Sequence, residues 1–121
     1  MGQVVALVDD LFFQAKILET ARQTGVEVKI VATGPALLEA VAGGAGHAPG
    51  LLLVDLNLRG GAIQVLEALH QAGNPAPVIA FLSHVQVELA ERARAAGCSQ
   101  VMPRSKFSQD LAEILRRARP Q

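Results

Sequence analysis

The sequence predicts an α/β fold in which five parallel strands, in the order 2-1-3-4-5, carry helices on both faces. Short apolar runs alternate five times with longer amphipathic segments, which is the pattern of a parallel sheet with helical crossovers. Two of the runs lead directly into aspartate, Val4–Val8 before Asp9 and Leu51–Val54 before Asp55. The chain has 121 residues, so we expect a single domain over residues 1–121.

The strands are predicted from their apolar residues. Runs without alternation, as in the first and third, are typical of strands buried on both faces. The second run alternates around Glu27 and Lys29, so we expect it to be shorter and more exposed. The predicted strands are residues 3–8, 26–31, 51–55, 77–82 and 100–102.

The helices are predicted from helical periodicity and from glycine and proline at their ends. The first should bury a face made of Leu11, Ala15, Leu18 and Ala21, joined by Phe12 and Ile17. Thr33 or Gly34 should cap the second helix, and Ser105 or Ser108 the last. The predicted helices are residues 11–24, residues 36–42, a segment that starts at Ile63 and ends at Gly73, residues 87–96, and about residues 107–118. Residues 43–50 are predicted to form a loop.

Three acids are predicted to meet at one edge of this sheet. In the order 2-1-3-4-5 the first and third strands are neighbours, so Asp9, Asp10 and Asp55 converge where the chain order reverses. Such a cluster suits Mg²⁺, which takes few carboxylates and keeps several waters. The alternative for Asp9 and Asp10 is capping of the first helix. Repulsion within the cluster predicts that Asp10→Asn stabilises the metal-free protein.

An aspartate can also attack phosphorus and form an aspartyl phosphate. That chemistry needs cations and hydroxyl or backbone donors around the phosphoryl oxygens. Arg104 and Lys106 follow the fifth predicted strand, and Ser83 follows the fourth. The alternatives are a turn residue for Ser83 and a solvated charge for Arg104.

Composition excludes several other classes of protein. The formal net charge is zero, which argues against general nucleic-acid binding. Cys98 is the only cysteine, so no internal disulfide forms, and a reducing compartment fits. The N-terminus has no basic segment before its short apolar run, and no apolar stretch reaches the ~18 residues of a membrane span. We therefore expect a cytoplasmic protein that does not contact membranes.

Several motifs resemble the receiver domain of response regulators from two-component signalling, over essentially the whole chain. They are Val8-Asp9-Asp10, Val54-Asp55 followed by Asn57, and Ala95-Ala96-Gly97-Cys98. The resemblance implies a flavodoxin-like fold, Mg²⁺ as cofactor and phosphorylation of Asp55. It further implies Asp10 as the main side-chain ligand of the metal, Asp9 as a ligand through water, and Asn57 as a ligand through its backbone carbonyl.

Later landmarks depart from the family pattern. Counting without a gap puts Leu82 where the family has Thr or Ser, with Ser83 one residue later. Arg104 stands at the position of the family lysine, Ser105 at that of the following proline, and Val101 at that of the aromatic switch residue. Arginine neutralises phosphate, but its planar fork differs from the point charge of lysine.

The preferred hypothesis is a stand-alone receiver, not an enzyme beyond self-dephosphorylation, that takes a phosphoryl group on Asp55 from a histidine kinase or phosphotransfer protein. The alternative is a pseudo-receiver, a phosphorylation-independent interaction module that uses its fourth and fifth helices as a partner or homodimer surface. A small phosphate-ester hydrolase is disfavoured, because no second acid for the leaving group is evident. His47, His70 and His84 lack metal-ligand spacing, and only His84 lies near the predicted crevice.

Overall fold

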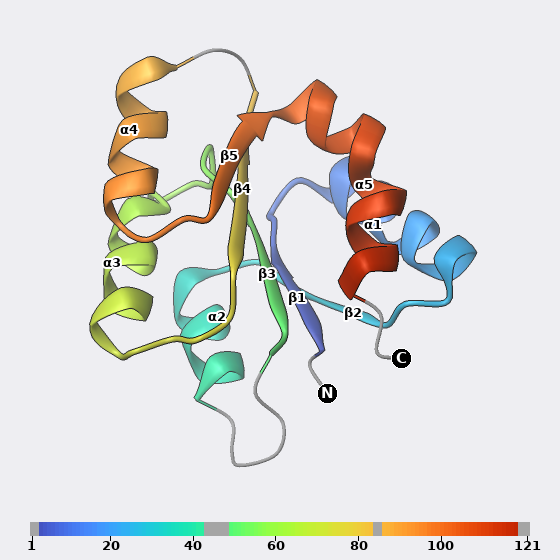
Figure 1. The fold of residues 1–121 in the computed structure, drawn as a ribbon, viewed down its shortest axis with the longest axis horizontal. Helices are drawn as coiled ribbons and strands as arrows, with labels where there is room; N and C mark the ends of the chain where they lie inside the picture. Colours follow the sequence, from blue (N-terminus) through green and yellow to red (C-terminus); the bar gives the residue numbers. More distant parts are fainter. Residues whose placement is uncertain (1–2, 43–48, 84–85, 119–121) are drawn as a thin grey trace.

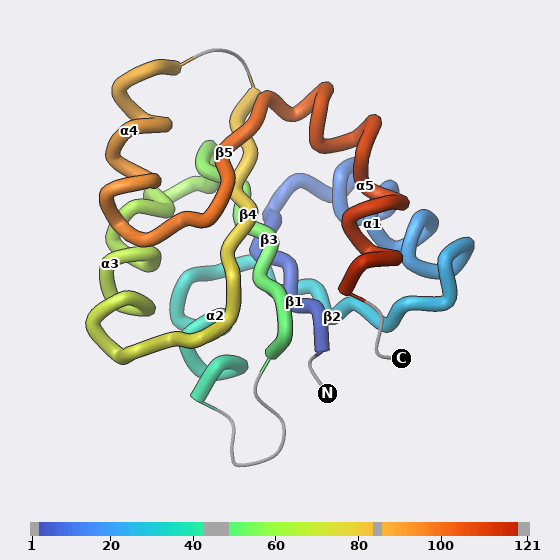
Figure 2. Tube along the Cα trace, viewed as in Figure 1, coloured from blue at the N-terminus to red at the C-terminus, as the bar shows by residue number. Residues whose placement is uncertain are grey.

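The computed structural model describes residues 3–42, 49–83 and 86–118, and over these ranges five strands alternate with five helices. Figure 1 shows the sheet in the middle of the molecule, and Figure 2 follows the same path as a tube. The elements are β1 (Val4–Leu7), α1 (Leu11–Thr24), β2 (Val28–Val31), α2 (Gly34–Val41), β3 (Leu51–Asp55), α3 (Ile63–Gln71), β4 (Val78–Leu82), α4 (Val87–Ala95), β5 (Gln100–Pro103) and α5 (Arg104–Ala118).

All strand pairs are parallel, and the strand order β2-β1-β3-β4-β5 confirms the predicted topology. Leu7, the last residue of β1, lies opposite Val54 of β3, and Asp55 lies opposite Phe81 of β4. The carboxyl ends of the three central strands therefore meet at one edge of the sheet, with Asp55 at the end of the middle strand.

The helices form two layers, with α2, α3 and α4 on one face of the sheet and α1 and α5 on the other (Figure 1). Side chains that alternate along each strand feed two cores. Leu52 and Val54 pack in the core beneath α2, α3 and α4, whereas Leu51 and Leu53 pack in the core beneath α1 and α5. Because both faces are covered, every residue of β1 and β3 is buried.

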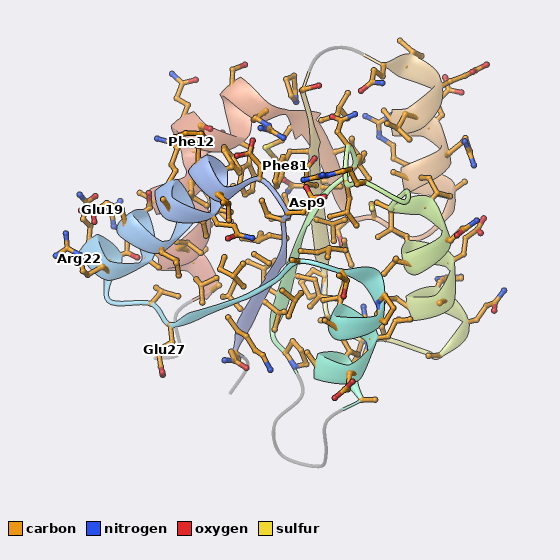
Figure 3. All side chains as sticks on the ribbon, turned by 180° about the vertical axis from the view of Figure 1, so that it is seen from behind. Asp9, Phe12, Glu19, Arg22, Glu27 and Phe81 are labelled. Atoms are coloured by element: carbon orange, nitrogen blue, oxygen red, sulfur yellow. The ribbon has the colours of Figure 1, made fainter. Side chains whose placement is uncertain are left out.

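The apolar face predicted for α1 is confirmed at Ile17 and Ala21 and wrong at its other four residues. The buried residues of α1 are Phe13, Ile17, Ala21 and Thr24. By contrast Leu11 is 76% exposed, Phe12 91% and Leu18 47%, and Figure 3 labels Phe12 on this helix. The helix carries two apolar stripes. The stripe that starts at Phe13 faces the core because the Phe13 ring packs with the rings of Phe81 and Phe107 beneath α1 and α5.

That cluster joins three segments that are distant in sequence. The ring centroids of Phe81 and Phe107 stack 4.2 Å apart, and Phe13 lies 5.0 Å from Phe81 and 5.9 Å from Phe107. Phe81 and Phe107 are fully buried. Aromatic pairs at such distances stabilise beyond the area that they bury, so this cluster fixes the rotation of α1 and the position of α5.

The last helix begins at Arg104, three residues before the predicted start, directly after the final residue of β5. Ser105 and Ser108 therefore lie inside α5, and the prediction that one of them caps it is wrong. The periodic apolar residues begin at Phe107, and the helix extends one polar turn further back. This turn places Arg104 at the carboxyl edge of the sheet.

Other boundaries agree within two residues. Thr33 caps α2, because its Oγ1 accepts the backbone N–H of Ala36 at 3.3 Å. Gly34 is packed so tightly that an added Cβ would lie 2.5 Å from Cγ2 of Val65. Residues 43–48 of the predicted loop, with His47, and also His84, lie outside the described residues. Within the described ranges no helix is long and apolar enough to cross a membrane.

Candidate functional site

Asp55 is the most buried charged side chain at the carboxyl edge of the sheet. Its side chain is 2% exposed. One carboxylate oxygen, Oδ1, accepts the backbone N–H of Asn57 at 2.9 Å, and Oδ2 accepts Nη2 of Arg104, also at 2.9 Å. Burial raises the pKa of Asp55, and the charges of Asp9 and Asp10 raise it further, while the Asn57 N–H and the Arg104 charge oppose the shift.

Asp10 caps α1, which confirms the capping alternative for this residue. Its Oδ1 accepts the backbone N–H groups of Phe12 at 2.9 Å and Phe13 at 3.2 Å. Its Oδ2 faces the sheet edge and accepts Nη1 of Arg104 at 3.3 Å. The Phe13 N–H, together with Arg104, lowers the pKa of Asp10. Favourable contacts therefore hold the Asp10 charge, which removes the basis for expecting Asp10→Asn to be stabilising.

Asp9 faces the loop after β3. Its Oδ2 accepts the backbone N–H of Arg59 at 3.1 Å and lies 3.6 Å from Arg59 Nε. The Arg59 side chain is 91% exposed, and exposed ion pairs contribute little to stability. The backbone hydrogen bond nevertheless ties the β1–α1 connection to the β3–α3 connection. Figure 3 labels Asp9, which follows β1, and Phe81 of β4 close to one another in projection.

Arg104 joins two of the three acids. Its Nη1 contacts Asp10 and its Nη2 contacts Asp55, so one guanidinium bridges both carboxylates. The guanidinium carbon lies 4.7 Å from the ring centroid of Phe13 and 5.7 Å from that of Phe81. The side chain is only 26% exposed. The solvated-charge alternative for Arg104 is therefore wrong.

Lys106 occupies a different environment. Its Nζ pairs with Oδ2 of Asp110 at 2.8 Å, one turn further along α5, and its side chain is 59% exposed. Because α5 starts at Arg104, Lys106 lies within the first turns of the helix. Of the two predicted cations, the structure brings Arg104 to the acids and directs Lys106 to Asp110.

The residue at the end of β4 is Leu82, and not Ser83. Leu82 is the last residue of the strand, is 3% exposed, and packs in the core beneath α2, α3 and α4. Ser83 follows the strand, and its side chain is exposed. Its backbone N–H donates to Oδ1 of Asn57 at 2.6 Å, while Nδ2 of Asn57 donates to Oε1 of Gln86 at 3.0 Å. The Asn57 side chain thus ties the loop after β3 to the connection after β4.

Sequence reasoning missed this role of the Asn57 amide, and it did not consider Gln86 at all. Asparagine is common in turns, where its side chain bonds the nearby backbone, but no local signal points to these distant partners. Its partners depend on how the β4–α4 connection passes the site. The backbone carbonyl of Asn57, which the resemblance makes a metal ligand, is therefore held in a loop that the Asn57 side chain anchors.

Asp9, Asp10 and Asp55 do not form the predicted three-acid metal cluster. Within the described residues, no group of three or more Asp, Glu, His or Cys side chains is gathered closely enough to hold one. Asp10 and Asp55 nevertheless share one cation, the Arg104 guanidinium. Mg²⁺ often takes one or two carboxylates and keeps its remaining waters. Asp10 and Asp55 would therefore be the side chains that hold a hydrated Mg²⁺, with water at its remaining positions.

No protein-family model and no curated protein matches the sequence. Solved structures do match. The receiver domain of NtrX from Brucella abortus is 18% identical with a TM-score of 0.81, covering 96% of this chain and 97% of that one. The chemotaxis response regulator CheY4 of Vibrio cholerae is 20% identical with a TM-score of 0.78, covering 98% of this chain and 99% of that one. The fold is that of a response-regulator receiver domain.

A further neighbour with this receiver fold is the Mn²⁺-bound form of response regulator Rcp1, with a TM-score of 0.71 and 16% identity, covering 96% of this chain and 90% of that one. The neighbours are mainly receiver domains, which confirms the predicted fold class and the resemblance. At these identities the likeness shows the fold alone.

Proposed function

We propose that this chain is a signalling receiver that accepts a phosphoryl group on Asp55. The observation that carries the proposal is the placement of the Asp55 carboxylate. It lies at the carboxyl end of the central strand, with one oxygen on the Asn57 N–H and the other on Arg104. A nucleophilic carboxylate must be ionised. The Arg104 charge favours the ionised form and offsets part of the effect of burial.

The transfer needs no redox step. An oxygen of Asp55 attacks the phosphorus of a phosphohistidine or acyl-phosphate donor, and the bond from phosphorus to the donor breaks with its electron pair leaving on the donor. Arg104 is close enough to exchange its contact with Asp55 for one with a phosphoryl oxygen. Ser83, directly after β4, is the candidate hydroxyl donor. A bound Mg²⁺ would be held by Asp10, Asp55, the Asn57 carbonyl and, through water, Asp9, and would neutralise phosphoryl charge.

Two surfaces are proposed for partners. The exposed Leu11, Phe12 and Leu18 of α1 form an apolar stripe that begins beside Asp10, so a phosphodonor protein seated there would also reach the mouth of the site. On the other side, a groove of about 200 Å³ lies between α4 and β5 and includes Val87 and Val101. We propose this groove as the contact for a downstream protein.

The test is incubation with Mg²⁺ and a small acyl-phosphate donor, followed by intact-mass measurement of the native protein and Asp55→Asn. The proposal predicts that the native protein gains the mass of one phosphoryl group and that Asp55→Asn gains none. Lys106→Gln serves as a matched control, because Lys106 pairs with Asp110 rather than with the acids, and it should be labelled like the native protein. A native protein that stays unmodified at saturating donor would overturn the proposal.

The second candidate is a phosphorylation-independent interaction module. Two observations favour it: Arg104 engages both Asp10 and Asp55, and β4 ends in the buried Leu82 rather than in a hydroxyl residue. A module of this kind would bind its partner equally well as the native protein and as Asp55→Asn. A receiver would lose the phosphodonor-dependent part of its binding in Asp55→Asn.

A further inference from the structure

The guanidinium of Arg104 contacts the carboxylates of both Asp10 and Asp55. Nη1 lies 3.3 Å from Oδ2 of Asp10, and Nη2 lies 2.9 Å from Oδ2 of Asp55. The remaining oxygens are engaged elsewhere: Oδ1 of Asp10 accepts two backbone N–H groups of α1, and Oδ1 of Asp55 accepts the N–H of Asn57. The two Oδ2 atoms are therefore the carboxylate oxygens that Arg104 engages in this structure.

We propose that Arg104 is a built-in competitor of the divalent cation. The site holds either the guanidinium or Mg²⁺ between Asp10 and Asp55, and the ion pairs of Arg104 set the affinity for the metal. The inference rests on the acidic site of the proposed function. It is nevertheless independent of phosphoryl transfer, because it concerns only which cation the two carboxylates hold.

The competition depends on arginine rather than on a positive charge in general. A guanidinium presents several N–H donors in a rigid planar fork, so two nitrogens can contact two carboxylates at once. A lysine ammonium is a single point of charge on a flexible stem. At position 104 it would neutralise one acid without bridging the pair. Arg104→Lys therefore separates the effect of bridging from the effect of charge.

Some contacts of the Arg104 side chain favour its position beside the acids, and one feature favours its movement toward solvent. The rings of Phe13 and Phe81 lie against the guanidinium, and such contacts favour a cation. Its Nε is buried, with no hydrogen-bond partner among the described residues. A buried donor without a partner is costly, so moving the side chain toward solvent would hydrate Nε. Arg104 binds the two acids through its terminal nitrogens Nη1 and Nη2. In the proposed competition Mg²⁺ replaces these two contacts.

The experiment is a titration with MgCl₂ at constant ionic strength, followed by the backbone amide shifts of Phe12, Phe13 and Asn57. In the native protein Mg²⁺ must displace the charged hydrogen bonds of Arg104, and in Arg104→Gln these bonds are absent. The strength of such bonds predicts that Arg104→Gln binds Mg²⁺ roughly 10- to 100-fold more tightly than the native protein. Arg104→Lys should fall between Arg104→Gln and the native protein. Lys106→Gln removes the same charge two residues away, and it should bind Mg²⁺ like the native protein.

A second readout in the native protein follows the side-chain Nε–Hε resonance of Arg104. If the two cations exclude one another, this resonance shifts in step with the amide of Asn57 as Mg²⁺ is added. The inference is overturned if Arg104→Gln and Arg104→Lys bind Mg²⁺ within about twofold of the native protein. It is also overturned if none of the variants binds Mg²⁺, or if the Arg104 resonance stays fixed while Asn57 shifts. Failure to phosphorylate Asp55 would leave these affinities unaffected and would count against the proposed function alone.

Discussion

Phe13→Leu tests whether the aromatic cluster supports Arg104. The Phe13 ring lies 4.7 Å from the guanidinium carbon and 5.0 Å from the ring centroid of Phe81. Leucine keeps the site apolar but removes the ring face from both neighbours. The substitution therefore changes the packing of α1 and the environment of Arg104 together. A double-mutant cycle with Arg104→Gln separates the two effects.

The magnitude follows from the contacts. Replacing one buried apolar side chain by another of similar size costs up to about 1.5 kcal/mol, and losing aromatic pairs costs about 0.5–1.5 kcal/mol. A cation–π contact contributes about 0.5–1 kcal/mol at exposed sites and about 2 when desolvated. Because the Arg104 side chain is 26% exposed, we expect about 1 kcal/mol from this contact. Phe13→Leu should therefore lower the free energy of unfolding by about 2–3 kcal/mol.

The assay is urea unfolding of the native protein, Phe13→Leu, Arg104→Gln and the double variant. We expect Phe13→Leu to cost about 1 kcal/mol less in the Arg104→Gln background, because the cation is already absent. The same cycle built with Lys106→Gln should be additive, since Lys106 pairs with Asp110. A coupling energy for Phe13 and Arg104 below about 0.3 kcal/mol would refute the reasoning.

Three further predictions concern Asp10, Asp55 and the contact between α2 and α3. Asp10→Ala should lower the urea midpoint in chelator, because it removes both the cap of α1 and an ion pair with Arg104; an unchanged or higher midpoint would show that carboxylate repulsion dominates. Burial raises the pKa of Asp55, so the native state binds this proton more tightly than the unfolded chain, and stability falls as pH rises from the unfolded pKa through the raised folded pKa. Asp55→Asn should therefore gain stability relative to the native protein across that window, and parallel pH profiles of the two midpoints would contradict this. Gly34→Ala should cost about 1–3 kcal/mol by overpacking, because its Cβ would lie 2.5 Å from Val65 Cγ2, and Val65→Ala in the same chain should recover part of the loss.

The fold could be predicted because its signals are local. Unbroken apolar runs marked the buried strands, and the bounds predicted for α1 and β3 are those observed. Strand order and strand ends then placed Asp9, Asp10 and Asp55 at one edge of the sheet. The N-cap contact of Asp10 is local and was one of the predicted alternatives. The Arg59 backbone contact of Asp9 and the bridge that Arg104 makes between Asp10 and Asp55 join segments distant in sequence, so these contacts could not be predicted.

The rotation of α1 shows where local information ends. The stripe that includes Leu11 and Leu18 is as regular in sequence as the one that includes Phe13 and Ile17, and propensity does not choose between them. The choice is made by Phe81 and Phe107, which are distant in sequence and meet only in the folded core. Arg104 is a similar case. Counting placed it at the family lysine, but its bridging contact depends on α5 starting directly at the end of β5.

The most direct test of the account is a crystal structure of the protein with Mg²⁺ and beryllofluoride, a mimic of the phosphoryl group. The account predicts beryllofluoride on an oxygen of Asp55, Mg²⁺ between Asp10 and Asp55, and Arg104 turned from both carboxylates toward the fluorine atoms. A structure in which Arg104 still bridges Asp10 and Asp55 at saturating concentrations of both ligands, with neither of them bound, would contradict it.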